Sequence, residues 1–230
     1  MNTQPAEIKA VVFDAYGTLF DVYGVTSLCD ELFPTRGAAL ATMWRAKQLQ
    51  YTLLRSLMDR YEDFWQITGD SLTFSTRSLG LDLTSEKRER LMQAYLTLPA
   101  FPDAKAGLEQ LKALGVRLAI LSNGEPKMLA AAARAAGLSR LLDAVISVDE
   151  VRTYKPSPQV YGLVAKRLDV VAAQTWFVSA NSWDVQGAGA AGLTAFWIQR
   201  SSADPAEELG WPVAGVVRAI TDLPAALKSR

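Results

Sequence analysis

The strongest constraint on the fold is the stretch KAVVFDAYGTLFDV at residues 9–22. Its short run of valines and phenylalanine is typical of a strand buried on both faces of a sheet. The Gly-Thr step that follows indicates a turn. Because open α/β sheets bind their ligands at the carboxyl ends of parallel strands, this strand is predicted to deliver Asp14 into a site at that edge.

The second half of the chain alternates helical segments with short apolar ones. Four apolar segments are predicted to be strands: VRLAILS, AVISV, TWFVSA and TAFWIQR. A Gly/Ala-rich helix is predicted to begin at Asp184, and the tail is predicted to add a short edge strand at 213–217 and a final helix. This alternation from residue 103 onward is the βαβ rhythm of a parallel sheet.

Residues 28–98 have a mostly helical pattern instead. Their clearest amphipathic run is TMWRAKQLQYTLLRSLMDRYEDFWQ. A second helix is predicted to begin near Thr84 and to continue through LMQAYLTL to Pro99. We therefore predict an α/β protein in which residues 1–22 and 100–230 form a core with a parallel sheet, and residues 23–99 form an inserted helical cap.

Composition and charge exclude several classes of partner. Lys plus Arg and Asp plus Glu each number 24, so no net field attracts nucleic acid or an anionic membrane surface. No uninterrupted apolar run reaches the ~18 residues of a transmembrane helix, and the first ten residues lack the features of an export signal. Cys29 is the only cysteine, which excludes an intrachain disulfide and is typical of a reduced, cytoplasmic protein.

The chain contains no histidine. This excludes catalytic Ser-His and Cys-His pairs and metal ligation by imidazole. Any catalysis must therefore use carboxylate, lysine, arginine, tyrosine or hydroxyl groups.

Polar residues follow the predicted parallel strands, whose carboxyl ends meet at one edge of the sheet. Taken singly, each has an ordinary structural alternative, because a carboxylate or hydroxyl can cap a helix or turn and a loop lysine can be a solvated charge. Together they bring hydroxyls, an ammonium and two carboxylates to one place, which favours an active site. The set is Asp14, Ser122, Lys155, Ser179, Asn181 and Asp184.

These residues carry a family resemblance. The segments FDAYGTLFD, ILSNG, YKPSPQVY and SANSWDVQGA resemble, in order and spacing, the four motifs of the haloacid dehalogenase superfamily. WRAKQLQYT, YEDFW and SVDEVRTYKPSP are similar to the L-2-haloacid dehalogenases rather than to the phosphatases of that superfamily. The resemblance spans almost the whole chain and implies a Rossmann-like core with a helical cap.

Two features distinguish this sequence from those phosphatases. In those phosphatases a second Asp, two residues after the nucleophilic Asp, protonates the departing alkoxide. The nucleophilic Asp corresponds to Asp14 here, and the second position is Tyr16. Halide is the conjugate base of a strong acid and leaves without a proton, so its expulsion needs no such acid. Ser179 and Ala180 stand where a further acidic metal ligand would precede Asp184, so no metal and no other cofactor is expected.

The resemblance implies that Asp14 is a nucleophile. It would attack the Cα of an (S)-2-haloacid, displace halide with inversion and form an aspartyl ester. Water would then attack the ester carbonyl of Asp14 and release an (R)-2-hydroxy acid. Lys155 would pair with Asp14 and keep it ionised, and Thr18 would donate to the Asp14 side chain or to the developing oxyanion.

Four further residues would support the reaction. Asp184, with Ser179 and Asn181, is predicted to position and activate the hydrolytic water. Tyr161 is predicted to orient Lys155 through its hydroxyl, although a place on the inner face of its helix would explain this residue almost as well.

The substrate implied by the resemblance is a small 2-haloalkanoic acid. Ser122 and neighbouring backbone amides would hold its carboxylate, and Arg45 on the cap, with Asn123 beside it, would meet the departing halide. The alternative for Arg45 is an ordinary exposed helix charge, and aromatics at helical spacing are more often core than pocket. The apolar wall around the alkyl group and halogen would consist of Tyr16, Leu49, Phe64 and Trp183.

The preferred interpretation is a metal-independent (S)-2-haloacid dehalogenase, and the family resemblance alone implies a homodimer. A Mg²⁺-dependent phosphatase for a small phosphate ester is the alternative within the superfamily, and Tyr16 argues against it. A non-catalytic module that binds small carboxylates is the alternative of a different class. The intact set of Asp14, Lys155 and Asp184 argues against that module.

Overall fold

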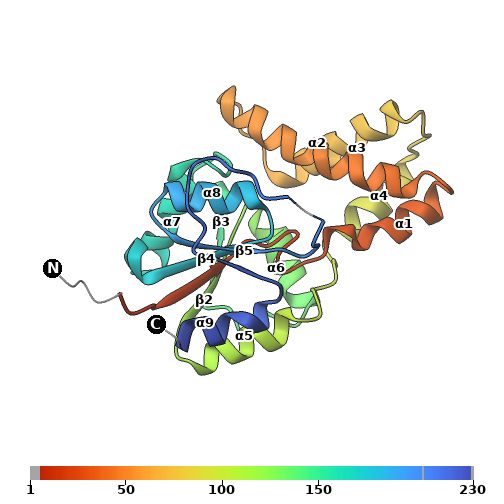
Figure 1. Ribbon diagram of the computed structural model, residues 1–230. Coiled ribbons are helices and arrows are strands. Elements are labelled where there is room, and N and C mark those ends of the chain that lie inside the picture. Colours follow the sequence, from red (N-terminus) through yellow and green to blue (C-terminus); the bar gives the residue numbers. More distant parts are fainter. Residues whose placement is uncertain (1–5, 204, 229–230) are drawn as a thin grey trace.

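The computed structural model describes residues 6–203 and 205–228 (Figure 1). At its centre is a six-stranded parallel sheet with the strand order β3-β2-β1-β4-β5-β6. The strands are β1 (Ala10–Phe13), β2 (Arg117–Ser122), β3 (Ala144–Ser147), β4 (Thr175–Ser179), β5 (Thr194–Ile198) and β6 (Gly215–Val217). The predicted parallel sheet, including its short edge strand, is confirmed.

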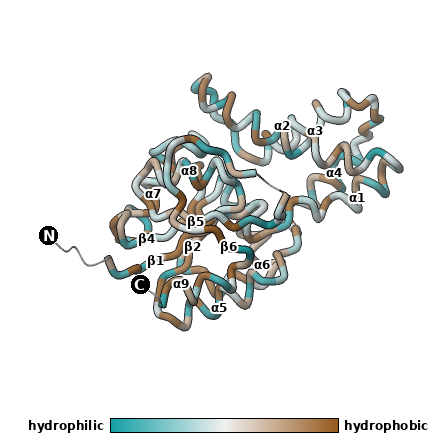
Figure 2. The backbone as a smooth tube through the Cα atoms, in the orientation of Figure 1, coloured by the Kyte–Doolittle hydropathy of each residue, from teal (hydrophilic) through white to brown (hydrophobic). Residues whose placement is uncertain are grey.

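Strand β1 lies in the middle of the sheet, and all four of its residues are fully buried. Its last residue, Phe13, is in register with Ile120 of β2 and Val178 of β4. The hydrophobic strands run through the interior of the molecule (Figure 2). The residues that follow three neighbouring strands are therefore brought to one edge of the sheet.

Helices cover both faces of this sheet. In Figure 1, α7 and α8 lie on one face and α5 and α9 on the other. The helices of the core are α5 (Ala104–Ala113), α6 (Pro126–Ala135), α7 (Pro158–Leu168), α8 (Ser182–Ala190) and α9 (Leu223–Lys228), with short 3-10 helices at Val148–Glu150, Ala172–Gln174 and Ile220–Asp222; a further 3-10 helix, Val22–Val25, leads into the helical insertion. None of the helices within the described ranges is both long and apolar enough to cross a membrane.

Four helices between β1 and α5 pack together beside the core (Figure 1). They are α1 (Thr26–Leu32), α2 (Gly37–Leu57), α3 (Phe64–Ser78) and α4 (Ser85–Ala94). Helix α2 packs along α3, where the Trp44 indole N–H donates to the Thr68 carbonyl at 2.8 Å and the Gln48 amide donates to the Thr68 hydroxyl at 2.7 Å. The predicted helical insertion is confirmed, while its division from the core at residues 22/23 and 99/100 stays a prediction.

The chain enters and leaves the helical insertion along two adjacent segments. The Asp21 N–H donates to the Pro99 carbonyl at 2.8 Å, and the Phe101 N–H donates to the Leu19 carbonyl at 2.9 Å. These bonds tie both connections to the chain just beyond Asp14. The helical insertion is thereby joined to the core close to the predicted site.

Three predicted helix boundaries were wrong. The long amphipathic run breaks at residues 58–63, where Asp59 has a left-handed φ of 53° and the Asp63 carboxylate accepts the Gln66 N–H at the start of α3. Helix α4 begins after Thr84 as predicted but ends at Ala94 rather than near Pro99. Helix α8 begins at Ser182, two residues earlier than predicted, so Asp184 lies within its first turn.

Candidate active site

A buried ion-pair cluster lies at the carboxyl edge of the sheet. The Lys155 ammonium donates to Asp14 Oδ1 at 3.0 Å and to Asp184 Oδ2 at 2.8 Å. Exposed fractions of these three residues are 2% for Lys155, 6% for Asp14 and 0% for Asp184. One buried cation thus bridges two carboxylates that would otherwise repel each other.

Three different elements bring these groups together. Asp14 follows β1 and continues its parallel pairing, because its N–H donates to the Val178 carbonyl at 2.9 Å. Lys155 lies in the loop before α7, and its backbone N–H donates to the Asn123 side-chain oxygen at 3.0 Å. Asp184 comes from the first turn of α8, after β4. The predicted convergence of the strand ends is therefore seen in the side chains.

The second oxygen of Asp14 is held by two donors. Asn181 donates its side-chain N–H to Oδ2 at 2.9 Å, and the Thr18 hydroxyl donates to the same atom at 3.3 Å. Thr18 Oγ1 in turn accepts the Ala180 N–H at 2.8 Å, which orients its proton toward Asp14. Thr18 lies where it was predicted, whereas Asn181 contacts Asp14 rather than standing with Asp184.

The predicted contact between Tyr161 and Lys155 was wrong. The Tyr161 hydroxyl donates to Asp184 Oδ1 at 2.7 Å instead. Helices α7 and α8 approach closely at this point, because a Cβ on Gly187 would lie 2.5 Å from the Tyr161 hydroxyl oxygen. Gly187 thus permits the contact, and Tyr161 orients a carboxylate rather than the ammonium.

Burial and charge act in opposite directions on this cluster. Burial alone would lower the pKa of Lys155, but the adjacent Asp14 and Asp184 carboxylates outweigh it and the pKa lies above its usual value. Burial raises the pKa of Asp184 to about 6, even though Lys155 lowers it. Lys155 is therefore charged at neutral pH, and Asp184 is a stronger base than an exposed Asp.

Arg45 reaches from α2 into the pocket that Asp14 lines. It is 8% exposed, and its guanidinium donates to the Gln48 side-chain oxygen at 2.8 Å and to the Tyr16 carbonyl at 3.1 Å. Both acceptors are neutral. Among the described residues, none of the ion pairs includes Arg45. A buried cation without a carboxylate partner favours an anion in the adjacent pocket.

A small, enclosed pocket separates Arg45 from Asp14. Phe64 stacks on the Tyr16 ring at a centroid distance of 5.4 Å and is 1% exposed. All seven residues predicted to bind substrate line this pocket together with Asp14 and Asn181. The lining is Asp14, Tyr16, Arg45, Leu49, Phe64, Ser122, Asn123, Asn181 and Trp183.

Comparison with known proteins decides the family. The protein-family model of the haloacid dehalogenase-like hydrolases matches residues 8–192 of this chain. An (S)-2-haloacid dehalogenase of Pseudomonas sp. (strain YL) is 46% identical over 220 residues, which cover 94% of each chain. The chain belongs to the haloacid dehalogenase-like hydrolases.

Solved structures place it among the L-2-haloacid dehalogenases of this family. The crystal structure of one L-2-haloacid dehalogenase has a TM-score of 0.94 and 44% identity, and the match covers 97% of this chain and 100% of that one. Another, the L-2-haloacid dehalogenase from Xanthobacter autotrophicus with chloropropionic acid covalently bound, has a TM-score of 0.91 and 40% identity, with 96% and 98% covered. The predicted fold and family are confirmed.

Sequence reasoning missed two residues of this haloacid dehalogenase-like site. Gln48 holds Arg45 through its side-chain oxygen, and its position three residues further along the same helix was a signal for such a contact. Gly187 permits the Tyr161 contact, and nothing in a Gly/Ala-rich helix distinguishes that glycine before the two helices are docked. Ser179, which was predicted to help position water, accepts the Asn181 N–H at 3.1 Å and so shapes the turn after β4.

The donor set does not fit the divalent cation used by phosphatases of the superfamily. Within residues 6–203 and 205–228, no three acidic or cysteine side chains are grouped as a metal site requires. The two carboxylates that do meet, Asp14 and Asp184, share the Lys155 ammonium between them.

Proposed function

We propose that the protein hydrolyses (S)-2-haloacids to (R)-2-hydroxy acids through an aspartyl ester on Asp14. The observation that carries the proposal is the buried Arg45 guanidinium, which lines the same pocket as Asp14 and has only neutral acceptors. A nucleophile opposite an unpaired cation suits a reaction that expels an anion. The names of the relatives supply the substrate class and its configuration.

In the first step, Asp14 attacks the substrate Cα from the side opposite the halogen. The new C–O bond forms as the carbon–halogen bond breaks, and the halide leaves with the bonding electrons toward Arg45. Asn123 also lines the pocket, and its side-chain N–H groups give the halide a second donor. Ser122, whose hydroxyl oxygen accepts the Gly124 N–H at 3.1 Å, keeps its own proton for the substrate carboxylate.

Expulsion of halide requires no proton donor near Asp14. Tyr16 occupies the position two residues on, where it is 2% exposed and stacked on Phe64. Burial raises the pKa of the Tyr16 phenol above its usual range, so this hydroxyl is a poor acid. Such a site suits a leaving group that departs unprotonated and argues against the phosphatase alternative.

In the second step, water attacks the ester carbonyl carbon of Asp14. Asp184 takes the proton from this water, and the Tyr161 hydroxyl on Oδ1 keeps the carboxylate oriented. The Thr18 and Asn181 donors stabilise the negative charge that develops on the Asp14 oxygen. As the ester C–O bond breaks, Asp184 returns its proton to the departing alkoxide oxygen, and the 2-hydroxy acid is released. Asp14 keeps one oxygen from water and becomes a carboxylate again by losing the second water proton to solvent.

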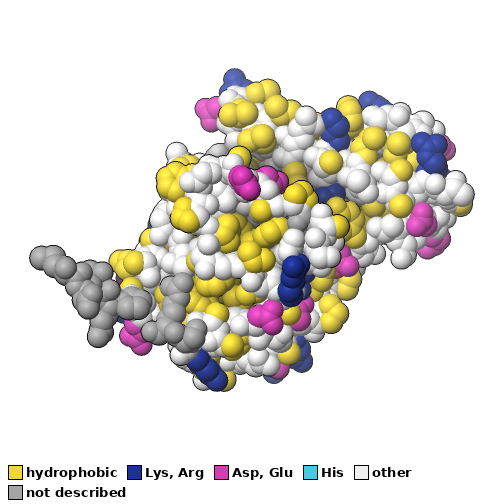
Figure 3. Space-filling view, viewed as in Figure 1, with side chains coloured by type: hydrophobic (Ala, Val, Ile, Leu, Met, Phe, Trp, Pro, Cys, Tyr) yellow, Lys and Arg dark blue, Asp and Glu magenta, His cyan; other side chains and the backbone are white. Residues whose placement is uncertain are grey.

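A homodimer and a cytoplasmic location complete the proposal. An apolar surface supports the dimer, because Leu57 and Met58 at the end of α2 are 75% and 57% exposed. Figure 3 shows hydrophobic side chains at this end of the helical insertion. The cytoplasmic location rests on the single cysteine, Cys29, which is buried as a free thiol.

Halide release in the presence of EDTA tests the proposed function. The protein is incubated with L-2-chloropropionate and EDTA and chloride is measured, then with a phosphate ester and Mg²⁺ and phosphate is measured. We expect chloride release without added metal and none from Asp14→Asn. Phosphate release that depends on Mg²⁺, without chloride release, would identify a phosphatase instead. Binding of the acid without turnover would identify a carboxylate-binding module.

A single turnover in ¹⁸O-labelled water tests the ester intermediate. Because water is expected to attack the Asp14 carbonyl, the label should enter Asp14 and not the first molecule of product. Mass spectrometry of the peptide that contains Asp14 measures this incorporation. Label found in the first product, with none in the enzyme, would show that water attacks Cα directly.

A further inference from the structure

We propose that a second cavity, beside the reaction pocket, binds the alkyl chain of the substrate and extends the substrate class to 2-haloalkanoic acids longer than propionate. The inference rests on the proposed function and deepens it. It follows from the position, chemistry and size of this cavity, which we call the outer cavity. Its lining is Ala46, Lys47, Leu49, Gln50, Thr52, Leu53, Lys155, Pro156 and Trp183.

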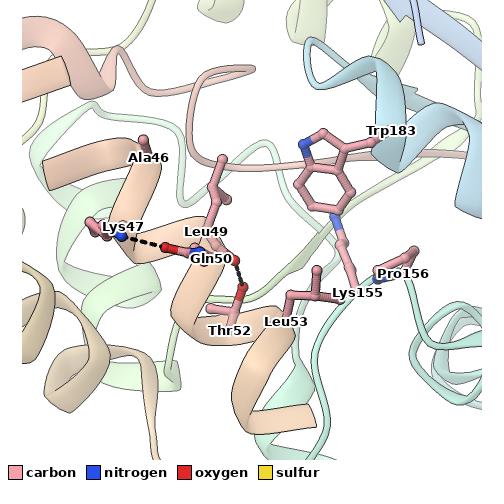
Figure 4. A pocket seen from close by; sticks show the side chains of 9 residues that line it. All are labelled: Ala46, Lys47, Leu49, Gln50, Thr52, Leu53, Lys155, Pro156 and Trp183. Carbon is pink, nitrogen blue, oxygen red and sulfur yellow. Dashed lines mark hydrogen bonds between the residues drawn. The ribbon is translucent and has the colours of Figure 1, made fainter. Parts of the chain in front are cut away.

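The outer cavity lies between the helical insertion and the core. Figure 4 shows helix α2 along one side, with Trp183, Lys155 and Pro156 on the other. Its volume is about 590 Å³. This is within the range of ligand pockets in proteins, which is about 300 to 1,000 Å³.

The outer cavity adjoins the reaction pocket. Leu49 and Trp183 line both spaces, and Lys155, which lines the outer cavity, donates to Asp14. The reaction pocket itself is small, about 10 Å³, which by this measure is about the space of one water molecule. A substituent on Cα that exceeds the reaction pocket therefore meets Leu49 and Trp183 and continues into the outer cavity.

The polar side chains around the outer cavity already have partners. The Lys47 ammonium donates to the Gln50 side-chain oxygen at 2.7 Å, and the Thr52 hydroxyl donates to the Leu49 carbonyl at 2.8 Å, as drawn in Figure 4. Lys155 is bound to its two carboxylates. The remaining wall is aliphatic or aromatic, so an apolar chain fits it better than a polar ligand.

The wall also leaves apolar surface that a ligand would cover. Leu53 of α2 is 46% exposed and faces this cavity. Ala46, which lies on the same face of α2 as Leu49 and Leu53, is also exposed. Covering such surface favours binding by up to about fourfold for each methylene that leaves water.

Chain-length selectivity tests the inference. We compare kcat/KM for L-2-bromopropionate, L-2-bromobutanoate and L-2-bromohexanoate. The value is expected to rise with length, roughly twofold to fourfold for each added methylene. A steady fall from propionate to hexanoate would overturn the proposal.

A matched pair of variants on one helix locates the effect. Leu53→Glu places a carboxylate in the wall and should lower the hexanoate to propionate ratio of kcat/KM at least fivefold relative to the unaltered protein. Leu54→Glu makes the same change at the next residue, which is 41% exposed and outside the cavity lining, and should leave the ratio within twofold. Equal loss of the ratio in both variants would overturn the proposal.

Ala46→Phe fills the outer cavity without adding charge. It should lower the same ratio, whereas Ala39→Phe at an exposed position of α2 should not. A ratio that stays unchanged in Ala46→Phe would argue against a chain in this space.

A binding measurement separates this inference from the proposed function. Calorimetric titration with hexanoate and propionate requires no turnover, and we expect tighter binding of hexanoate in the unaltered protein but not in Leu53→Glu. If L-2-bromopropionate is not dehalogenated, the proposed function is wrong, whichever acid binds. If L-2-bromopropionate is dehalogenated but hexanoate and propionate bind equally well, only the outer-cavity proposal is wrong.

Discussion

Asp184 is surrounded by groups that influence its protonation in opposite directions. Burial raises the pKa of its carboxyl to about 6, although the Lys155 ammonium and the Tyr161 hydroxyl both favour the charged form. A carboxylate of this basicity accepts a proton more readily than an ordinary Asp and is still largely ionised at neutral pH. These properties match the base that hydrolysis of the ester requires.

The pH dependence of turnover tests this assignment. Below about pH 6 Asp184 is protonated and cannot take a proton from water, so kcat is expected to fall as the pH drops through this value. In Tyr161→Phe the hydroxyl that favours the charged form is lost and the pKa of Asp184 rises. The acidic limb of the kcat profile should therefore move to higher pH, by about one unit if the lost bond contributed about 1.5 kcal/mol.

The same removal of a hydroxyl elsewhere serves as the control. Tyr51 lies on α2 and packs on Phe74, away from the ion-pair cluster, so Tyr51→Phe should leave the profile in place. If Tyr161→Phe lowers kcat by the same factor at every pH, its hydroxyl does not act through the protonation of Asp184.

The end of α2 and the segment between α2 and α3 contact the core just before Lys155. The Tyr61 hydroxyl, between α2 and α3, donates to the Asp149 carboxylate. The Tyr154 hydroxyl donates to the Glu62 carbonyl at 2.5 Å, and the Tyr154 N–H donates to the Ser56 hydroxyl oxygen at 3.0 Å. Because Tyr154 directly precedes Lys155, these contacts connect the position of the insertion to the position of the ammonium.

A double-mutant cycle measures the strength of this connection. Tyr61→Phe and Asp149→Asn should each lower the free energy of unfolding, and the two effects should be non-additive. We expect a coupling of about 1.5 to 3 kcal/mol, because the hydrogen bond involves a charged acceptor. Denaturant unfolding of the two single variants and the double variant provides the values.

Asp143→Asn provides the control carboxylate, since Asp143 pairs with Lys112 and is not a partner of Tyr61. Its effect should add to that of Tyr61→Phe within about 0.5 kcal/mol. If the effects of Tyr61→Phe and Asp149→Asn on the free energy of unfolding add to the same precision, the bond between Tyr61 and Asp149 does not couple the insertion to the core.

At the scale of the whole molecule, the exposed apolar surface at the end of α2 predicts self-association. The mass in solution should be about 50 kDa, twice the 25.1 kDa of one chain. Leu57→Glu places a charge on this surface and should shift the equilibrium toward the monomer, because a buried unpaired charge opposes association. Sedimentation velocity at several concentrations measures the shift.

A similar substitution on the core tests whether the surface is specific. Val171 is 60% exposed, and Val171→Glu should leave the mass unchanged. A monomer for the unaltered protein at all concentrations would contradict the proposed dimer and leave the active site, which one chain supplies, unaffected.

Much of the architecture was predictable because it depends on local pattern and on a general topological rule. Short apolar runs marked every strand of the sheet, and the parallel βαβ order required their carboxyl ends to meet. Asp14, Lys155 and Asp184 were therefore predicted as neighbours before any distance was known. Boundaries such as the break at residues 58–63 were less predictable, because the apolar pattern continues through them.

The partners of individual side chains were decided only by the tertiary structure. Tyr161 reaches Asp184 rather than Lys155 because Gly187 lets α7 and α8 approach closely. Asn181 turns to Asp14, and Arg45 is buried without a carboxylate, because both depend on how the helices are rotated and docked.

By itself the sequence determined which chemical groups lie at the edge of the sheet, since residue order along a parallel sheet dictates that edge. Only the tertiary structure decided which atom donates to which, and whether space remains beside them. Hydrogen bonds form within about 3 Å and cavities depend on the fit of side chains from distant elements, so both require the packed molecule.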